Sequence, residues 1–292
     1  MQEILPPGSA SERDLALLRE ELTSYKPVVQ VIKKQKDNGL WGGNILGITP
    51  NKAQGIRDVG TVARYRQLVE LGLPAGERPY RLAERVLFRL LSRDENPTLF
   101  FEYRKAVKSN PPLGEWVRDQ MREAAAAALA HAGHIEDPRV RGAAHRIASR
   151  VSQFLRSEAA QKPIIRRGSR NLLNPEAYPP SLFSVALLAY MPGLQRERAG
   201  FVERLGVYLG TPETKRTYVI KIGRKIIQPT FQMLGDPLQA DSAGNPKDLP
   251  FALHWIELLA RLGMLDVSAV ARRILLRLLR DCDERGVWNP KN

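Results

Sequence analysis

The stretch "QKDNGLWGG", residues 35–43, follows a helical pattern and spaces a glutamine, a glycine and a tryptophan as Gln35-x3-Gly39-x-Trp41. The glycine lets the chain reverse after the helix, and the tryptophan can pack back against a neighbouring helical hairpin. The glutamine side chain can cap the next helix and tie two helical units together. This stretch therefore predicts the turn that closes a helical hairpin.

A second stretch, "CDERGVW", repeats this arrangement at residues 282–288. Cys282 stands in place of the glutamine, and Gly286 and Trp288 keep the spacing of the first copy. We expect this copy to end another outer helix in the same way.

Apolar helical stretches closed by glycine recur between the two copies. "ARYRQLVELG", "AAAALAHAG", "VALLAYMPG" and "HWIELLARLG" end at Gly72, Gly133, Gly193 and Gly263, so that successive glycines lie 61, 60 and 70 positions apart. A short polar link and a second helix with exposed Arg or Glu follow each glycine. Such a period indicates a solenoid or a closed ring of helix pairs, because one pair cannot bury its own apolar face. The first, more apolar helix of each pair is expected to form the inner layer.

The helical periodicity also predicts where the helices lie. One follows Ser11, with Asp14 in the capping-box position. Pro79, Pro97 and Pro138 stand at or near first turns, where a missing N–H costs little. The other predicted ranges are 26–36, 59–71, 79–92, 97–109, 114–132, 138–158, 181–191, 195–209, 249–263 and 267–284.

The Gln35–Trp41 spacing resembles the core of the QW motif in the squalene–hopene cyclase and protein prenyltransferase superfamily. The resemblance is carried by residues 28–92 and 250–288, and the three intervening repeats lack the motif. Gln30 and Arg277 stand where the motif has an aromatic residue. The members of this superfamily are α/α toroids. The resemblance and the repeats predict an all-α fold, an α/α toroid or curved solenoid of roughly six helical hairpins, in one domain over residues 1–292.

Two inserts, near residues 162–175 and 215–229, interrupt the helical pattern. In each, two short aliphatic stretches flank a basic turn, which predicts a β-hairpin. The second has Gly223 first in a two-residue turn of type II′. The nine cations of the inserts are Lys162, Arg166, Arg167, Arg170, Lys215, Arg216, Lys221, Arg224 and Lys225.

These cations have two interpretations. Lys and Arg on exposed strands protect sheet edges from aggregation. They can equally bind an anionic ligand: a phosphate, a nucleic-acid backbone or an acidic protein surface. In the second case the candidate binding residues are Arg166, Arg167, Arg170, Lys221, Arg224 and Lys225.

The resemblance implies that catalysis would need an acid. Class II terpenoid cyclases protonate their substrate with a D-x-D-D signature, in which neighbouring carboxylates hold one group protonated. Asp281 and Asp283 in "DCDE" resemble it loosely, although they stand in a turn where solvated carboxylates are expected. His254, beside Trp255 on an apolar helix, is a further catalytic candidate, with a satisfied core histidine as the alternative.

Metal and cofactor sites are not expected. Protein prenyltransferases hold zinc with an Asp, a Cys and a His, but Cys282 lacks the D-x-C spacing. His131, His134 and His145 have no Cys or carboxylate pair at ligand spacing. No nucleotide-cradling glycine motif and no Gly-x-Ser-x-Gly motif occurs.

The formal net charge is +14, and a surface this basic attracts nucleic acid, anionic lipid or acidic proteins. Much of the charge is arginine within amphipathic helices such as "RYRQLVELG" and "ARRILLRLLR", where we expect a solvated face rather than a binding stripe.

The rest of the composition predicts a cytoplasmic location. A single cysteine excludes an internal disulfide and fits a reducing compartment. We expect no signal peptide at the start, and the apolar run 124–130 is too short to cross a bilayer.

Three functions remain open from the sequence. The first is a non-catalytic scaffold or binding module with a basic rim for an anionic or protein partner. The second is an enzyme similar to terpenoid cyclases or prenyltransferases, with an apolar central cavity. The third is a helical-repeat nucleic-acid binder, whose affinity would fall steeply with salt.

Overall fold

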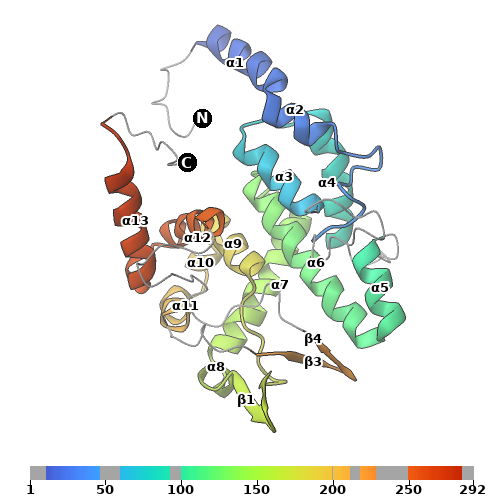
Figure 1. The fold of residues 1–292 in the computed structure, drawn as a ribbon, viewed down its shortest axis with the longest axis vertical. Helices are drawn as coiled ribbons and strands as arrows, with labels where there is room; N and C mark the ends of the chain where they lie inside the picture. The colour runs from blue at the N-terminus through green and yellow to red at the C-terminus, as the bar shows by residue number, and fades with distance from the viewer. Residues whose placement is uncertain are drawn as a thin grey trace. The chain divides into compact units, whose positions relative to one another are not determined.

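The computed structural model describes residues 11–46, 60–92, 100–198, 200–210, 218–227 and 249–284. Within them it is mostly helical, with two small antiparallel β-hairpins, as the sequence predicts (Figure 1). The chain divides into two compact units, Met1–Ala144 with Ile222–Lys225, and His145–Lys221 with Ile226–Asn292. The toroid or solenoid and the single domain stay predictions.

The first unit is built around one long helix, α6, which packs against α3, α4 and α5 (Figure 1). Every residue from Ala124 to Ala130 is buried. Because alanine side chains are short, the neighbouring helices can approach the α6 backbone closely. Arg122 of α6 also donates from Nε to the carbonyl oxygen of Leu90, at the end of α4 (3.1 Å). The helices of this unit are α1 (Glu12–Ser24), α2 (Lys26–Ile32), α3 (Thr61–Glu70), α4 (Arg78–Leu91), α5 (Phe101–Ser109), α6 (Pro111–His131) and the start of α7 (Pro138–Leu155).

The second unit contains the end of α7 and the remaining helices. Here α9 packs against α10 and α12, and the seven residues from Ser184 to Tyr190 are all buried. Trp255 of α12 is completely buried. The elements are α8 (Glu158–Gln161), α9 (Leu182–Tyr190), α10 (Pro192–Arg196), α11 (Phe201–Leu209), α12 (Leu249–Arg261), the 3-10 helix η4 (Leu265–Val267) and α13 (Ala269–Asp281). The strands of the two hairpins are β1 (Ile164–Arg167) with β2 (Arg170–Leu173), and β3 (Ile220–Ile222) with β4 (Lys225–Ile227).

Three of the four predicted helix-ending glycines are confirmed. Gly72, Gly133 and Gly263 have φ values of +79°, +92° and +67°. After each glycine, the next N–H returns to a carbonyl oxygen five residues back, as from Leu73 to Leu68 (3.1 Å). This is the hydrogen-bond pattern of a Schellman motif, which satisfies the last carbonyl groups of a helix.

The capping box and two of the three helix-starting prolines are also confirmed. Ser11 and Asp14 form the capping box, and Pro79 and Pro138 lie in first turns. Pro97 lies outside the described residues.

The prediction for Gly193 was wrong. Helix α9 ends earlier, at Tyr190, because Met191 precedes a proline and leaves the helical region with φ −123° and ψ 72°. Pro192 then begins α10, and Gly193 lies within that helix.

The prediction of a single helix over residues 195–209 was also wrong. α10 ends at Arg196, and Gly200, in the left-handed region with φ +63°, precedes α11. The second member of this repeat is therefore two short helices rather than one.

The turn at residues 35–41, which follows α2, is tied to the start of α4. Gln35 donates from Nε2 to the carbonyl oxygens of Gly39 (3.2 Å) and Pro79 (2.9 Å). It therefore ties this turn to the start of α4, as predicted, but by donating to a carbonyl group and not by capping helix N–H groups. Trp41 is completely buried and donates from Nε1 to the carbonyl oxygen of Val31 (2.8 Å). Gly286 and Trp288, the second copy, lie outside the described residues.

Gly39 meets two separate constraints in this turn. Its φ is +85°, a region that residues with a Cβ rarely adopt. A Cβ at this position would also lie 2.2 Å from the carbonyl oxygen of Leu82 in α4. The absence of a side chain is what allows the turn to contact the α4 backbone.

We predict that Gly39→Ala lowers the free energy of unfolding by about 3 kcal/mol, from backbone strain together with overpacking against α4. Gly76→Ala is the matched control, because Gly76 has nearly the same φ, +83°, and a Cβ added there would meet no described atom within 4 Å. The control should lose only about 1 kcal/mol. Urea unfolding measures both, and equal losses would show that the contact with Leu82 is unimportant.

Candidate anion-binding site

Helix α4 separates apolar and basic side chains onto different faces. Its buried residues include Tyr80, Ala83, Leu87 and Leu90. The exposed positions carry arginines that recur about once per helical turn, and because the helix repeats every 3.6 residues these fall along one face. They are Arg78, Arg81, Arg85 and Arg89.

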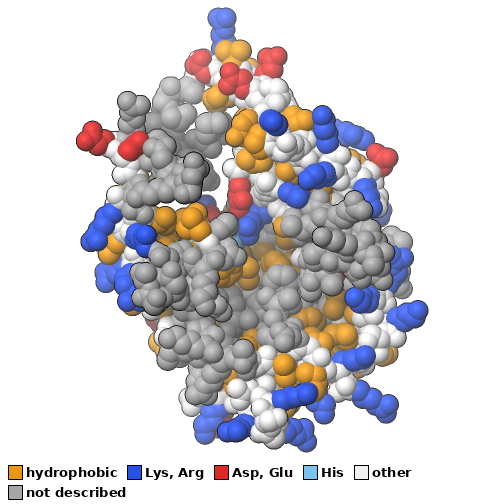
Figure 2. All heavy atoms as spheres, in the orientation of Figure 1, with side chains coloured by type: hydrophobic (Ala, Val, Ile, Leu, Met, Phe, Trp, Pro, Cys, Tyr) orange, Lys and Arg blue, Asp and Glu red, His pale blue; other side chains and the backbone are white. Residues whose placement is uncertain are grey.

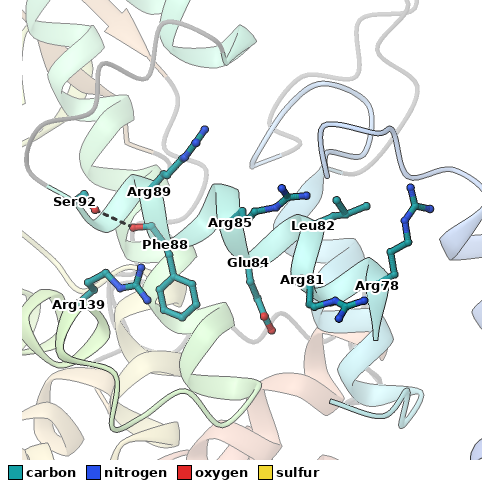
Figure 3. Close-up of a pocket in the computed structure, with 9 residues that line it drawn as sticks. All are labelled: Arg78, Arg81, Leu82, Glu84, Arg85, Phe88, Arg89, Ser92 and Arg139. Atoms are coloured by element: carbon teal, nitrogen blue, oxygen red, sulfur yellow. Dashed lines mark hydrogen bonds between the residues drawn. The ribbon is translucent and has the colours of Figure 1, made fainter. Parts of the chain in front are cut away.

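These arginines line an open cavity of about 810 Å³ in the first unit (Figure 3). Arg139, from the first turn of α7, lines the same cavity. The other lining residues are Leu82, Glu84, Phe88 and Ser92. Among the described residues, five guanidinium groups and one carboxylate therefore surround the cavity, which makes it strongly positive.

The arginines differ in how far their charge is neutralised. Arg78 lies 4.0 Å from the carboxylate of Asp37, and both side chains are largely exposed, so this pair is weak. Arg81 and Arg85 are exposed and make no hydrogen bond or ion pair with any described residue.

The carboxylate that lines the cavity, Glu84, is held by two other elements. Its Oε1 accepts hydrogen bonds from the hydroxyl of Tyr65 in α3 (2.9 Å) and from Nε2 of His134 in the α6–α7 turn (2.8 Å). Burial alone would raise the pKa of Glu84, but these two bonds outweigh it and the pKa is lowered. The bond to Glu84 in turn raises the pKa of His134. Glu84 and His134 therefore stabilise each other's charged form.

Arg139 is fixed by contacts on its face and on its edge. Its guanidinium lies 3.9 Å from the centre of the Phe88 ring, and Figure 3 shows the two groups against each other. Its Nε and Nη2 donate to the two carboxylate oxygens of Asp137 (3.0 and 2.8 Å). These bonds lower the pKa of Asp137 and raise that of Arg139. The His134 ring packs against the same phenyl ring in a T-shaped arrangement, with the ring centres 5.3 Å apart.

The residues of the predicted basic inserts lie on the two hairpins. Arg166, Arg167 and Arg170 are exposed on β1 and β2, where Arg167 stands directly opposite Arg170. Basic side chains are visible at the lower edge of Figure 2, where Figure 1 places β1.

Lys221, Arg224 and Lys225 are exposed on the second hairpin, and Lys215 and Arg216 lie outside the described residues. The turn of this hairpin is held in the first unit, since Asn110 donates from Nδ2 to the carbonyl oxygen of Ile222 (2.7 Å). Gly223 opens the turn with φ +55°.

The sequence-predicted catalytic candidates are not brought into this cavity. His254 is buried in α12, with Nδ1 3.5 Å from Oε2 of Glu257. The contact with His254 and the bond from Arg261 lower the pKa of Glu257 to about 2, against the effect of burial. Asp281 is the last residue of α13, and Asp283 is exposed just beyond it.

The histidines around the α6–α7 turn go to different partners. His134 pairs with Glu84, whereas His145 lies 3.5 Å from Glu197. Among the described residues, no group of three His, Cys, Asp or Glu side chains is arranged to hold a metal ion.

The arginines of α4 are the site residues that sequence reasoning missed. They belong to the helical arginines that the sequence assigned to a solvated face. In "RPYRLAERVLFRLL" these arginines recur about once per helical turn, and this spacing could have predicted a basic face on the helix. The contribution of Arg139, which lies fifty residues further along the chain, had no local signal.

Comparison of the chain with protein-family models, curated proteins and solved structures finds no match. The relation to the cyclase and prenyltransferase superfamily therefore stays a prediction. Across the described part of the chain, no helix combines the length and apolar character needed to cross a membrane.

The Glu84–His134 pair predicts a pH-dependent contribution to stability. The raised pKa of His134 gives stability that is present below its ordinary pKa of 6.5 and is lost as pH rises through the raised value. The lowered pKa of Glu84 gives stability that is present above 4.5 and is lost as pH falls through the lowered value. The pair therefore contributes most to stability between pH 4.5 and pH 6.5.

We predict that Glu84→Gln lowers the free energy of unfolding by about 1 kcal/mol near pH 5.5, since it keeps an acceptor for Tyr65 but removes the charge. The difference from the wild type should shrink in alkaline solution. Urea unfolding from about pH 4 to 9 measures it, and NMR titration should show a lower pKa for His134 in the variant. A difference that is constant with pH would contradict the pairing.

Proposed function

We propose that the protein is a binding module for an anionic partner, with the α4 cavity as its principal site. The supporting observation is that Arg81 and Arg85 line one open cavity together with three further arginines, without enough carboxylates among its described lining residues to neutralise them all. Like charges that line one cavity add to a positive potential, which attracts an anion. Guanidinium groups also present paired N–H donors that match carboxylate, sulfate or phosphate oxygens.

The hairpins supply a second basic surface in this proposal. Arg167 and Arg170 stand opposite each other at the end of β1 and β2, although like charges in cross-strand positions destabilise a hairpin. An anion bound between the two facing arginines would offset this repulsion. This arrangement favours the binding interpretation of the insert.

The enzymatic alternative receives less support from the cavity. A cyclase-like mechanism needs a carboxylic acid that stays protonated in apolar surroundings. Glu84 has the opposite character, because its bonds to His134 and Tyr65 lower its pKa and keep it ionised. The surrounding arginines also make the cavity unsuited to a hydrocarbon substrate. We therefore favour binding over catalysis.

We predict that Arg81→Ala/Arg85→Ala weakens binding to a heparin oligosaccharide about tenfold, because each lost charge-assisted contact contributes roughly 0.7 kcal/mol or more at an exposed site. The control Arg146→Ala/Arg273→Ala removes the same net charge from positions outside the cavity. Fluorescence anisotropy at constant salt measures both. Equal losses in the two variants would show that heparin affinity depends on the net charge of the protein and not on the cavity.

A second variant separates the two interpretations of the hairpin cations. We predict that replacing Arg166, Arg167, Arg224 and Lys225 together by Ala weakens heparin binding relative to the wild type. The unfolding free energy should change little, because all four side chains are exposed. If these residues only protect strand edges, heparin affinity will be unchanged and light scattering will show aggregation instead.

A further inference from the structure

The arginines of α4 form a line and not a cluster. From Arg78 to Arg89 the helix rises about 16 Å, with successive arginines separated by about 4.5 to 6 Å along the axis. This spacing is close to the distance between consecutive phosphates of a nucleic-acid strand. A single small anion has no comparable linear repeat of charge. This line of Arg78, Arg81, Arg85 and Arg89, the arginine ladder, therefore fits a phosphodiester backbone lying along α4.

Arg139 differs from the ladder in charge and in geometry. Asp137 engages the edge of its guanidinium with two hydrogen bonds, so its charge is largely neutralised. Phe88 covers one face of the guanidinium plane at 3.9 Å, yet the side chain is 49% exposed. The outer face is thus a flat, rigid surface beside the cavity. Nucleic-acid bases stack on guanidinium planes as they do on aromatic rings.

A phosphate ladder beside a stacking surface is the arrangement that binds single strands. In a duplex the bases are stacked on each other and cannot reach Arg139, whereas an unpaired base can turn onto it. A duplex would use the four arginines of α4 but not the flat surface.

We infer that the α4 cavity binds single-stranded nucleic acid, with the phosphates along Arg78, Arg81, Arg85 and Arg89 and one base stacked on Arg139. This inference rests on the proposed function and specifies its ligand. Arg81 and Arg85 act through charge, and Phe88 and Asp137 act by holding Arg139 in plane.

The test measures binding of the full chain to fluorescein-labelled probes of about 12 nucleotides by anisotropy, over a series of salt concentrations. The probes are oligo-uridine, oligo-deoxythymidine, a DNA duplex and an abasic deoxyribose-phosphate strand. The wild type should bind both single strands at least roughly tenfold more tightly than the abasic strand. Arg81→Ala/Arg85→Ala should weaken binding to all probes and reduce the slope of log affinity against log salt by about 1.4, since each phosphate contact on a single strand contributes about 0.7.

Arg139→Lys tests the stacking surface, because it keeps the charge and loses the plane. Binding to oligo-uridine or oligo-deoxythymidine should weaken about fivefold with the salt slope unchanged, and binding to the abasic strand should not change. Phe88→Leu, which removes the support of the plane, should have the same effect and provides a second variant if the first is unstable. Arg141→Lys is the control, since Arg141 pairs with Glu136 and does not line the cavity.

The outcomes separate this inference from the proposed function. If heparin binding depends on Arg81 and Arg85 but the duplex or the abasic strand binds as tightly as the single strands, the inference fails and the anion-binding function stands. If neither heparin nor any strand responds to Arg81→Ala/Arg85→Ala, both fail.

Discussion

The first unit is organised by the close packing that the alanine side chains of α6 permit. With residues 124–130 fully buried, α3, α4 and α5 pack directly on this helix. Larger side chains would separate these helices, and overpacking of this kind typically costs about 1 to 3 kcal/mol. Burial of one face of α4 leaves its arginines no place except the solvent side. The core of the unit therefore determines the direction of the basic face.

Electrostatic contacts then fix the position of the groups around α4. One oxygen of Glu84 receives bonds from Tyr65 of α3 and His134 of the α6–α7 turn, so a single carboxylate connects three elements. The same turn leads to Asp137 and Arg139, and Arg139 lies on Phe88, one helical turn beyond Glu84. Paired charges thus build part of the wall of the cavity, whereas Arg81 and Arg85 pair with no described residue.

The turn at Gln35–Trp41 has a structural role of its own. Gln35 and Gly39 bring it against α4, and Trp41 fills the core between α2 and its own loop. These contacts explain the spacing of the three residues without reference to any reaction. A similarity in such a motif is therefore evidence about packing and not about a reaction.

Local sequence was enough to predict the helices, most of their ends and the two basic hairpins, because periodicity, glycine in the left-handed region and turn residues act over a few neighbouring positions. It wrongly took Gly193 as the glycine that ends α9 and predicted no break before α11, where Met191 before a proline and Gly200 outweighed the apolar pattern. It also contained the arginine spacing of α4. The meeting of Arg139 with Phe88 beside that face, and the pairing of Glu84 with His134, became apparent only in the folded chain. These contacts join residues about fifty positions apart, and their geometry follows from helix packing, which no local pattern records.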